Sequence, residues 1–233
     1  MPTSAQNRAS AFEREVLQSF DWTVRYTDKA YGITIRRRMS FGVRKGPQVG
    51  VAQGFDLLHL SSLMRLLVEC KSQQLEVGAD ASGYRGRFYV GRNLKREQVT
   101  WFLEHSIGIG VVPVYAFLIS RAGKGNRDKN AFLVSAETVA RNLLVYNYIS
   151  ILEMERTGVF LPRIHVNDEE RGTRLHIYDM DVGEVQQLTQ TFKVQAFGPD
   201  SAVRGWLVDA QEHGKLPVNC RKFLAGGENP WRG

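Results

Sequence analysis

The hydrophobic and polar positions along the chain predict helices and strands in alternation. Apolar residues recur at three- and four-residue steps over 4–20, which predicts a first helix. Over residues 22–43, β-branched and aromatic residues alternate with polar ones and predict strands or a basic hairpin. Residues 54–72 then read as two apolar runs joined by a pair of serines, the pattern of a buried hairpin.

The next elements are predicted by period and by capping residues. Residues 94–106 have a helical pattern, and residues 108–120 form a nearly continuous apolar run that indicates a buried strand. A short strand is expected at 131–135, where Ser135 can cap a helix over roughly residues 136–146. This order of elements predicts an α/β fold with a mixed central sheet flanked by helices.

The pattern weakens beyond Gly158. Residues 160–182 resemble two strands around an acidic turn, and no internal repeat is visible. We therefore predict a first domain over residues 1–150. Residues 151–233 are expected to form a C-terminal extension of unknown function, packed on that domain or at a dimer interface.

Three charged residues interrupt the apolar hairpin: Asp56, Glu69 and Lys71. If residues 61–62 are a two-residue loop, Asp56 lies opposite Leu67. All three charged side chains then share one face, with Asp56 and Glu69 as diagonal neighbours roughly 7–8 Å apart. Any even loop length preserves this shared face.

Paired carboxylates in a buried hairpin indicate a metal site. Asp56 and Glu69 would repel each other and lose hydration, and a divalent cation removes that difficulty. Mg²⁺ accepts one or two carboxylates, water and a substrate phosphate as ligands, and it activates water for phosphodiester hydrolysis. Lys71 can orient that water or offset charge on the phosphate. The alternative is an edge hairpin with solvated charges, but residues 65–72 are too apolar for it.

Asp56 followed by Glu69-Cys70-Lys71 at the end of an apolar strand resembles the signature of the PD-(D/E)XK nuclease superfamily. Phe55 stands where many members have proline. The order of three segments is similar to that in archaeal-type Holliday junction resolvases and in recombination nucleases of Gram-positive bacteria. These segments are residues 7–15, 68–72 and 88–120, and the resemblance covers roughly residues 4–146.

The resemblance implies a restriction-endonuclease-like sheet and further site residues. Glu13 would approach the metal from the first helix, as a third ligand with Asp56 and Glu69, and Gln98 would support the site. The implied catalytic set is Asp56, Glu69, Lys71, Glu13 and Gln98. The implied cofactor is Mg²⁺, for which Mn²⁺ can substitute. Four-way junctions are two-fold symmetric, so a homodimer acting on branched DNA is expected.

Basic residues gather in the first part of the chain. The formal charge is +7, with 22 Lys and Arg against 14 Asp and Glu in residues 1–156, and 9 against 10 in residues 157–233. This asymmetry favours a polyanionic partner. The candidate DNA-binding residues are Arg36, Arg37, Arg38, Arg85, Arg87, Arg92, Lys95 and Arg96. The interleaved aromatic residues, Phe88 among them, could wedge into an opened junction or anchor the loop to the core.

Other features exclude several classes of protein. Cys70 and Cys220 are too few for a disulfide framework and wrongly spaced for zinc, and no two histidines have metal-ligand spacing. No glycine-rich nucleotide loop and no apolar run of membrane-spanning length are present, so we expect a soluble, non-exported protein without nucleotide cofactor or membrane contact.

The resemblance implies a metal-dependent endonuclease that resolves four-way DNA junctions. A restriction-type or replication and repair endonuclease would use the same catalytic residues, so the motif alone does not separate these targets. A DNA-binding module on the same fold without catalysis is the third alternative, which the intact Asp, Glu and Lys set disfavours.

Overall fold

The computed structural model describes the chain over the following ranges: 11–14, 16, 33–36, 55–60, 65–75, 87–89, 94–121, 129–160, 182–214 and 216–226. Within them, the expected α/β fold with a mixed sheet flanked by helices is confirmed. No helix in these ranges combines the length and the apolar character that crossing a membrane requires.

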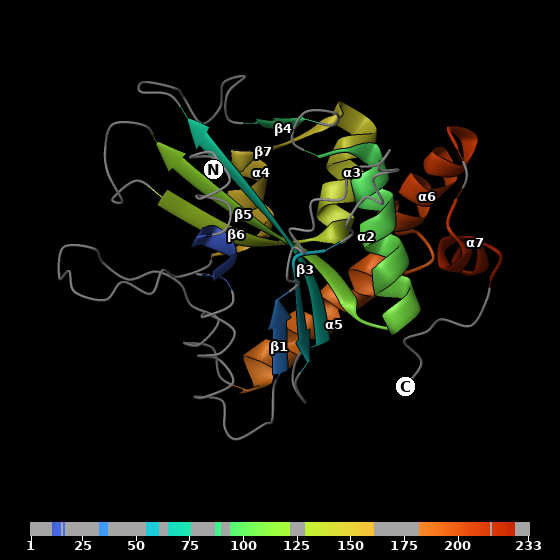
Figure 1. Cartoon of the computed structure of the whole chain (residues 1–233), viewed down its shortest axis with the longest axis horizontal. Helices are drawn as coiled ribbons and strands as arrows, with labels where there is room; N and C mark the ends of the chain where they lie inside the picture. Colours follow the sequence, from blue (N-terminus) through green and yellow to red (C-terminus); the bar gives the residue numbers. More distant parts are fainter. Residues whose placement is uncertain are drawn as a thin grey trace, which may run out of the picture.

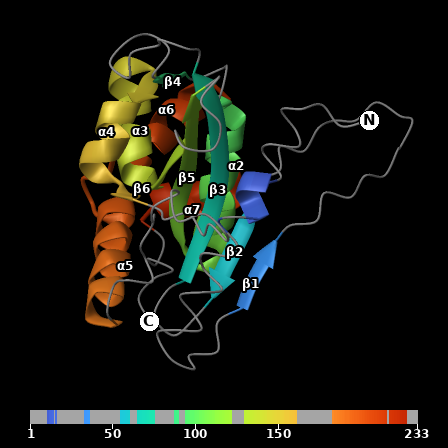
Figure 2. The ribbon, with the colours of Figure 1, turned by 90° about the vertical axis from the view of Figure 1, so that its left-hand side faces the viewer.

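A six-stranded sheet forms the centre of the described structure, in the order β1-β2-β3-β5-β6-β8. Its strands are β1 (Ile33–Arg36), β2 (Leu57–Leu60), β3 (Arg65–Leu75), β5 (Val112–Arg121), β6 (Lys129–Ser135) and β8 (Val159–Phe160). The β3–β5 pair is parallel and the other pairs are antiparallel. Figure 2 shows β1, β2 and β3 side by side at one edge of this sheet. A separate antiparallel pair joins β4 (Arg87–Tyr89) to β7 (Tyr148–Ser150).

Helices cover the sheet and extend beyond it. They are α2 (Arg96–Ile109), α3 (Ala136–Tyr146), α4 (Ile151–Thr157), α5 (Val182–Phe197), α6 (Ala202–Glu212) and α7 (Val218–Leu224). Residues 11–14 and 16 are also helical, as expected of the first helix. In Figure 1, α2, α3, α6 and α7 lie together on one side of the sheet.

The alternation of side chains along β3 and β5 divides the core into two clusters. Leu67, Tyr115 and Phe117 pack with α2, α3, α6 and α7 on one face. Val68 and Val114 belong to the cluster on the other face, where the first helix and α5 contribute. Glu69 and Lys71 share the parity of Leu67, so they belong to the first face, beneath α2.

The hairpin has an even loop length, but its register differs from the prediction. Leu57 pairs with Val68 and Leu60 with Arg65, so four residues, and not two, separate the strands. The prediction that Asp56 lies opposite Leu67 is therefore wrong. The regular ladder ends at the Leu57–Val68 pair, and the Asp56 amide donates to the Val68 carbonyl, so Asp56 lies just beyond the last paired position.

Ser135 caps α3 as its position predicts. Its side chain accepts a hydrogen bond from the Thr138 backbone amide at 3.1 Å. Asn147, in the left-handed region at φ 64°, ends the helix, and its backbone amide donates to Leu143. Local capping chemistry thus defines both ends of this helix.

Buried glutamates attach the C-terminal helices to the rest of the fold. Glu104 of α2 accepts from the backbone amides of Asn219 and Cys220 at 3.1 and 2.8 Å, at the start of α7. Glu137 of α3 accepts from the Ser201 hydroxyl and from the Val203 amide at the start of α6. These helices were not predicted, nor was the β4–β7 pair. Most of the predicted strand pair over 160–182 lies outside the described residues, and the division of the chain near residue 150 stays a prediction.

Candidate active site

Asp56 and Glu69 lie close together inside the sheet, where the residue before β2 meets β3. The backbone amide of Asp56 donates to the Val68 carbonyl at 3.0 Å, just beyond the end of the regular β2–β3 ladder. The Asp56 carboxylate in turn accepts from the Cys70 backbone amide at 2.7 Å through Oδ2. The strand pairing therefore fixes both the backbone and the side chain of Asp56 beside Glu69.

Glu69 is the buried centre of the cluster, with 2% of its side chain exposed. Its Oε1 accepts from Lys71 Nζ at 2.7 Å and from Gln98 Nε2. Its Oε2 is also buried and has no hydrogen-bond partner among the described residues. The predicted association of Gln98 with Glu69 and Lys71 is thus present in the structure, with Gln98 contributed by the first turn of α2.

Burial dominates the electrostatics of the cluster. Desolvation raises the pKa of Glu69 from 4.5 to about 7, and the neighbouring Asp56 adds to the rise, whereas Lys71 opposes it. The pKa of the Cys70 thiol is likewise raised by burial and by the carboxylates around it, so the thiol is protonated and inert at neutral pH. Negative charge is concentrated here, as at a site built to hold a cation.

Glu13 approaches from the opposite face of the sheet. Phe12 and Val16, on the same helical segment, are 2% exposed and pack in the cluster away from α2. The charge of Glu13 contributes to the raised pKa of Glu69, which places it within electrostatic range. In the described ranges, no three His, Cys, Asp or Glu side chains form a group that could hold a metal ion. A metal-ligand role for Glu13 stays a prediction.

The candidate DNA-binding residues fall into three groups. Lys95 is exposed just before α2. Arg87 and Arg96 stack over aromatic rings: Arg87 lies 4.3 Å from the ring centroid of Tyr148, and Arg96 lies over Trp206 and pairs with Asp209. Arg37, Arg38, Arg85 and Arg92 lie outside the described residues, as does the side chain of Arg36 in β1.

Phe88 anchors the basic segment to the core. It is 1% exposed, and its ring packs on Phe117 at a centroid distance of 4.9 Å. Phe117 is the neighbour of Lys71 in the β3–β5 pairing. A wedge formed by Phe88 is therefore excluded, and the alternative of an aromatic anchor holds for this residue.

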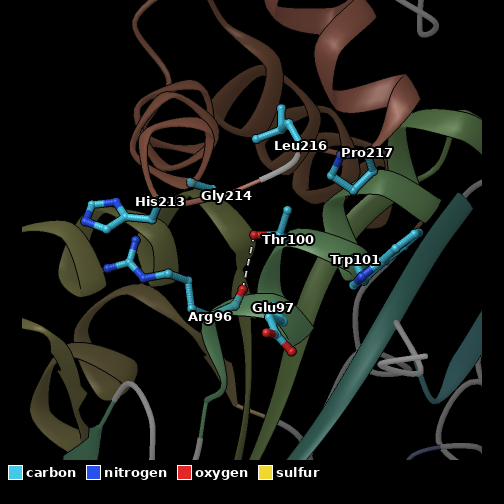
Figure 3. Close-up of a pocket in the computed structure, with 9 residues that line it drawn as sticks. Arg96, Glu97, Thr100, Trp101, His213, Gly214, Leu216 and Pro217 are labelled. Carbon is cyan, nitrogen blue, oxygen red and sulfur yellow. Dashed lines mark hydrogen bonds between the residues drawn. The ribbon is translucent and has the colours of Figure 1, made fainter. Parts of the chain in front are cut away.

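A pocket of about 270 Å³ lies on another side of α2. Figure 3 shows it between the first turns of α2 and the segment that joins α6 to α7, with Arg96 near His213 and with Leu216 and Pro217 above. Arg96 is paired with Asp209, and Glu97 also lines the cavity. The pocket therefore has no excess positive charge that would bind a phosphate. The pocket contains none of the cluster of Asp56, Glu69, Lys71 and Gln98.

Sequence reasoning missed one polar residue beside the cluster. Tyr115 is the partner of Glu69 in the parallel β3–β5 pairing and is almost fully buried. The available signal was a hydroxyl group within the otherwise apolar run at 111–119. Only the strand register shows which charged residue it accompanies.

No protein-family model matches the chain, and the comparison with curated proteins gave no match. Among solved structures, Archaeoglobus fulgidus Hjc, a Holliday junction resolvase from an archaeal hyperthermophile, is similar over 65% of this chain and 94% of that chain. The TM-score is 0.39 and the sequence identity is 14%. Because this superposition is loose, we infer function from the site residues themselves.

Proposed function

We propose that the chain is a metal-dependent endonuclease that hydrolyses phosphodiester bonds in branched DNA, with four-way junctions as its substrate. The observation that supports this proposal is the convergence of Asp56, Glu69, Lys71 and Gln98 at one point of the sheet. A buried carboxylate beside a second, partly buried carboxylate and an ammonium group is costly to fold, and hydrolysis of a phosphodiester would assign a function to each group.

The carboxylates fit Mg²⁺ or Mn²⁺. Asp56 and Glu69 would supply hard-oxygen ligands from neighbouring positions, and Glu69 Oε2 is a buried acceptor without a protein partner among the described residues. Mg²⁺ typically uses one or two carboxylates and completes its shell with water and substrate phosphate. When bound, it supplies charge neutralisation and a more acidic water molecule.

The protein groups around these carboxylates have separate tasks. The Cys70 amide holds Asp56, and Gln98 holds Glu69, so both carboxylates keep their orientation. Lys71, with 14% of its side chain exposed, is the group that can reach a phosphate at the surface. Its ammonium group would stabilise the negative charge that develops on the phosphate oxygens, as charged donors do in phosphoryl transfer.

Substrate binding would rely on phosphate contacts and on paired sites. Lys95 is exposed near the first turn of α2, close in sequence to Gln98, and the basic segments around residues 36–38 and 85–96 would extend the contact. A junction has two-fold symmetry, so symmetric cleavage calls for a homodimer with two active sites. Shape and deformability would then select the junction over linear DNA.

A comparison of substrates tests this proposal. A synthetic four-way junction and linear duplexes of matched sequence are incubated with the protein in Mg²⁺, and the products are resolved by denaturing electrophoresis. We expect paired, symmetric nicks in the junction and intact duplexes. Cleavage of the linear duplex would instead indicate a restriction or repair nuclease, and binding without cleavage would indicate a DNA-binding module.

A further inference from the structure

The two-stranded β4–β7 pair has one buried face and one outward face. Phe88 and Ile149 are partners in this pair, and their side chains are 1% and 0% exposed. Because side chains alternate along a strand, Arg87 and Tyr148 share the opposite face, and both are partly exposed. In Figure 1 the pair lies at the top of the molecule. It therefore covers the core with one face and leaves the other face to solvent.

One guanidinium group and two aromatic rings line up along the outward face. The guanidinium carbon of Arg87 lies 4.3 Å from the Tyr148 ring centroid, and the centroids of the Tyr146 and Tyr148 rings are 5.9 Å apart. Asn147, at φ 64°, ends α3 and turns the chain directly into β7, which brings the two tyrosines together. Tyr146 is 60% exposed. We call Arg87, Tyr146 and Tyr148 the tyrosine surface.

The tyrosine surface lies close to the candidate active site. Phe88, on the buried face of the same strand pair, packs on Phe117 at a ring-centroid distance of 4.9 Å. Phe117 is the strand partner of Lys71, and both belong to the face of the sheet that α2 covers. A DNA strand held at Lys71 can therefore continue towards the tyrosine surface.

Charge distinguishes between the partners that exposed aromatic rings can bind. Residues 84–96, which include β4, carry five Lys and Arg and no Asp or Glu. A second copy of the chain, docked here by two-fold symmetry, would place this basic segment against itself, and like charges would oppose each other. A polynucleotide has the complementary charge, and its bases stack on aromatic rings and guanidinium groups whatever their sequence. The chemistry therefore favours nucleic acid.

We propose that the tyrosine surface binds an unpaired base of branched DNA, stacked on Tyr146, while Tyr148 and Arg87 hold the Tyr146 ring in place. Extrusion of a base from the stack costs least where the base is already unpaired. The surface would therefore contribute to the selection of branched DNA over linear duplex. The inference rests on the proposed function, because it assigns a further contact to the same DNA substrate.

Binding of single strands in EDTA gives the first test, because it requires no cleavage. Labelled oligothymidylate presents bases, whereas an abasic strand of the same length presents only sugar and phosphate. By fluorescence anisotropy, wild type should bind oligothymidylate about tenfold more tightly than the abasic strand, as expected for one stacked base. Tyr146→Ala should bind both strands alike, and Tyr146→Phe, which keeps the ring, should bind as wild type does. A preference for oligothymidylate that persists in Tyr146→Ala would overturn the proposal.

Val145→Ala is the matched control for Tyr146→Ala. Val145 precedes Tyr146 and is 66% exposed, but it has no ring on which a base can stack. Val145→Ala should keep the preference for oligothymidylate, and neither variant should change the sedimentation coefficient of the DNA-free protein. A smaller species in both variants would identify the surface as an interface between copies of the chain, and it would overturn the proposal.

Cleavage of a four-way junction in Mg²⁺ separates this inference from the function on which it rests. Base-dependent binding that Tyr146→Ala abolishes, in a protein whose wild type does not cut DNA, would overturn the nuclease proposal and keep the tyrosine surface. Cleavage by wild type, together with base-dependent binding that Tyr146→Ala leaves unchanged, would keep the nuclease and overturn the role of the tyrosine surface.

Discussion

Substitution of Glu69 by glutamine should stabilise the metal-free protein while it removes nuclease activity. Folding raises the pKa of this carboxyl group from 4.5 to about 7, chiefly through burial. The native state therefore binds a proton more tightly than the unfolded state, and the stability of the protein falls as pH rises from 4.5 to 7. Glutamine keeps an acceptor oxygen for Gln98 and Lys71 but carries no charge.

The magnitude follows from the pKa of Glu69. Each pKa unit corresponds to about 1.4 kcal/mol, so the ionised carboxylate destabilises the fold by about 3 kcal/mol at pH 8 and by less than about 1 kcal/mol at pH 5. The contact with Lys71 is already contained in this pKa. Glu69→Gln should then exceed wild type by about 3 kcal/mol at pH 8 and by less than about 1 kcal/mol at pH 5.

Urea unfolding in EDTA at pH 5 and pH 8 measures this difference. Glu97→Gln is the matched control, because it removes the same charge from an exposed glutamate of α2. A Glu69→Gln variant that is less stable than wild type at pH 8, or whose advantage is the same at both pH values, would refute the assignment of Glu69 as a desolvated carboxylate.

Further predictions concern Lys71, Ser135 and Glu104. Lys71→Met should lower kcat for DNA cleavage by about 10²–10³-fold, because a charged donor to the phosphate is lost; an unchanged kcat would exclude that role. Ser135→Ala should lower the free energy of unfolding in urea by about 1 kcal/mol through loss of the α3 cap, and an effect below about 0.3 kcal/mol would show that the cap is dispensable. Glu104→Ala should destabilise the protein by about 3 kcal/mol, because two amides at the start of α7 lose charged acceptors; a stability equal to wild type in the same assay would contradict that attachment.

Local patterns predicted part of the hairpin. The alternation of side chains placed Glu69 and Lys71 on one face of β3, because side chains alternate with a period of two along a strand. The register itself was not predicted correctly, because the two serines do not mark the full loop.

Features that depend on distant contacts were not predicted. Helix α7 begins where Glu104, more than 100 residues earlier, accepts its backbone amides, and no local signal shows this contact. Tyr115 read as one member of an apolar strand, because its relation to Glu69 depends on which strands pair. Capping of α3 by Ser135 was predictable, since donor and acceptor lie three residues apart.

Cleavage of a four-way junction by wild type and Asp56→Asn, in Mg²⁺ and in EDTA, tests the central claim most directly. Asparagine keeps the size of Asp56 and an acceptor for the Cys70 amide, but it removes the charge that would hold the cation. The account predicts Mg²⁺-dependent nicks by wild type and none above background by the variant, with equal circular dichroism spectra. Cleavage by Asp56→Asn at the wild-type rate would contradict it, because the paired carboxylates would then not be the catalytic centre.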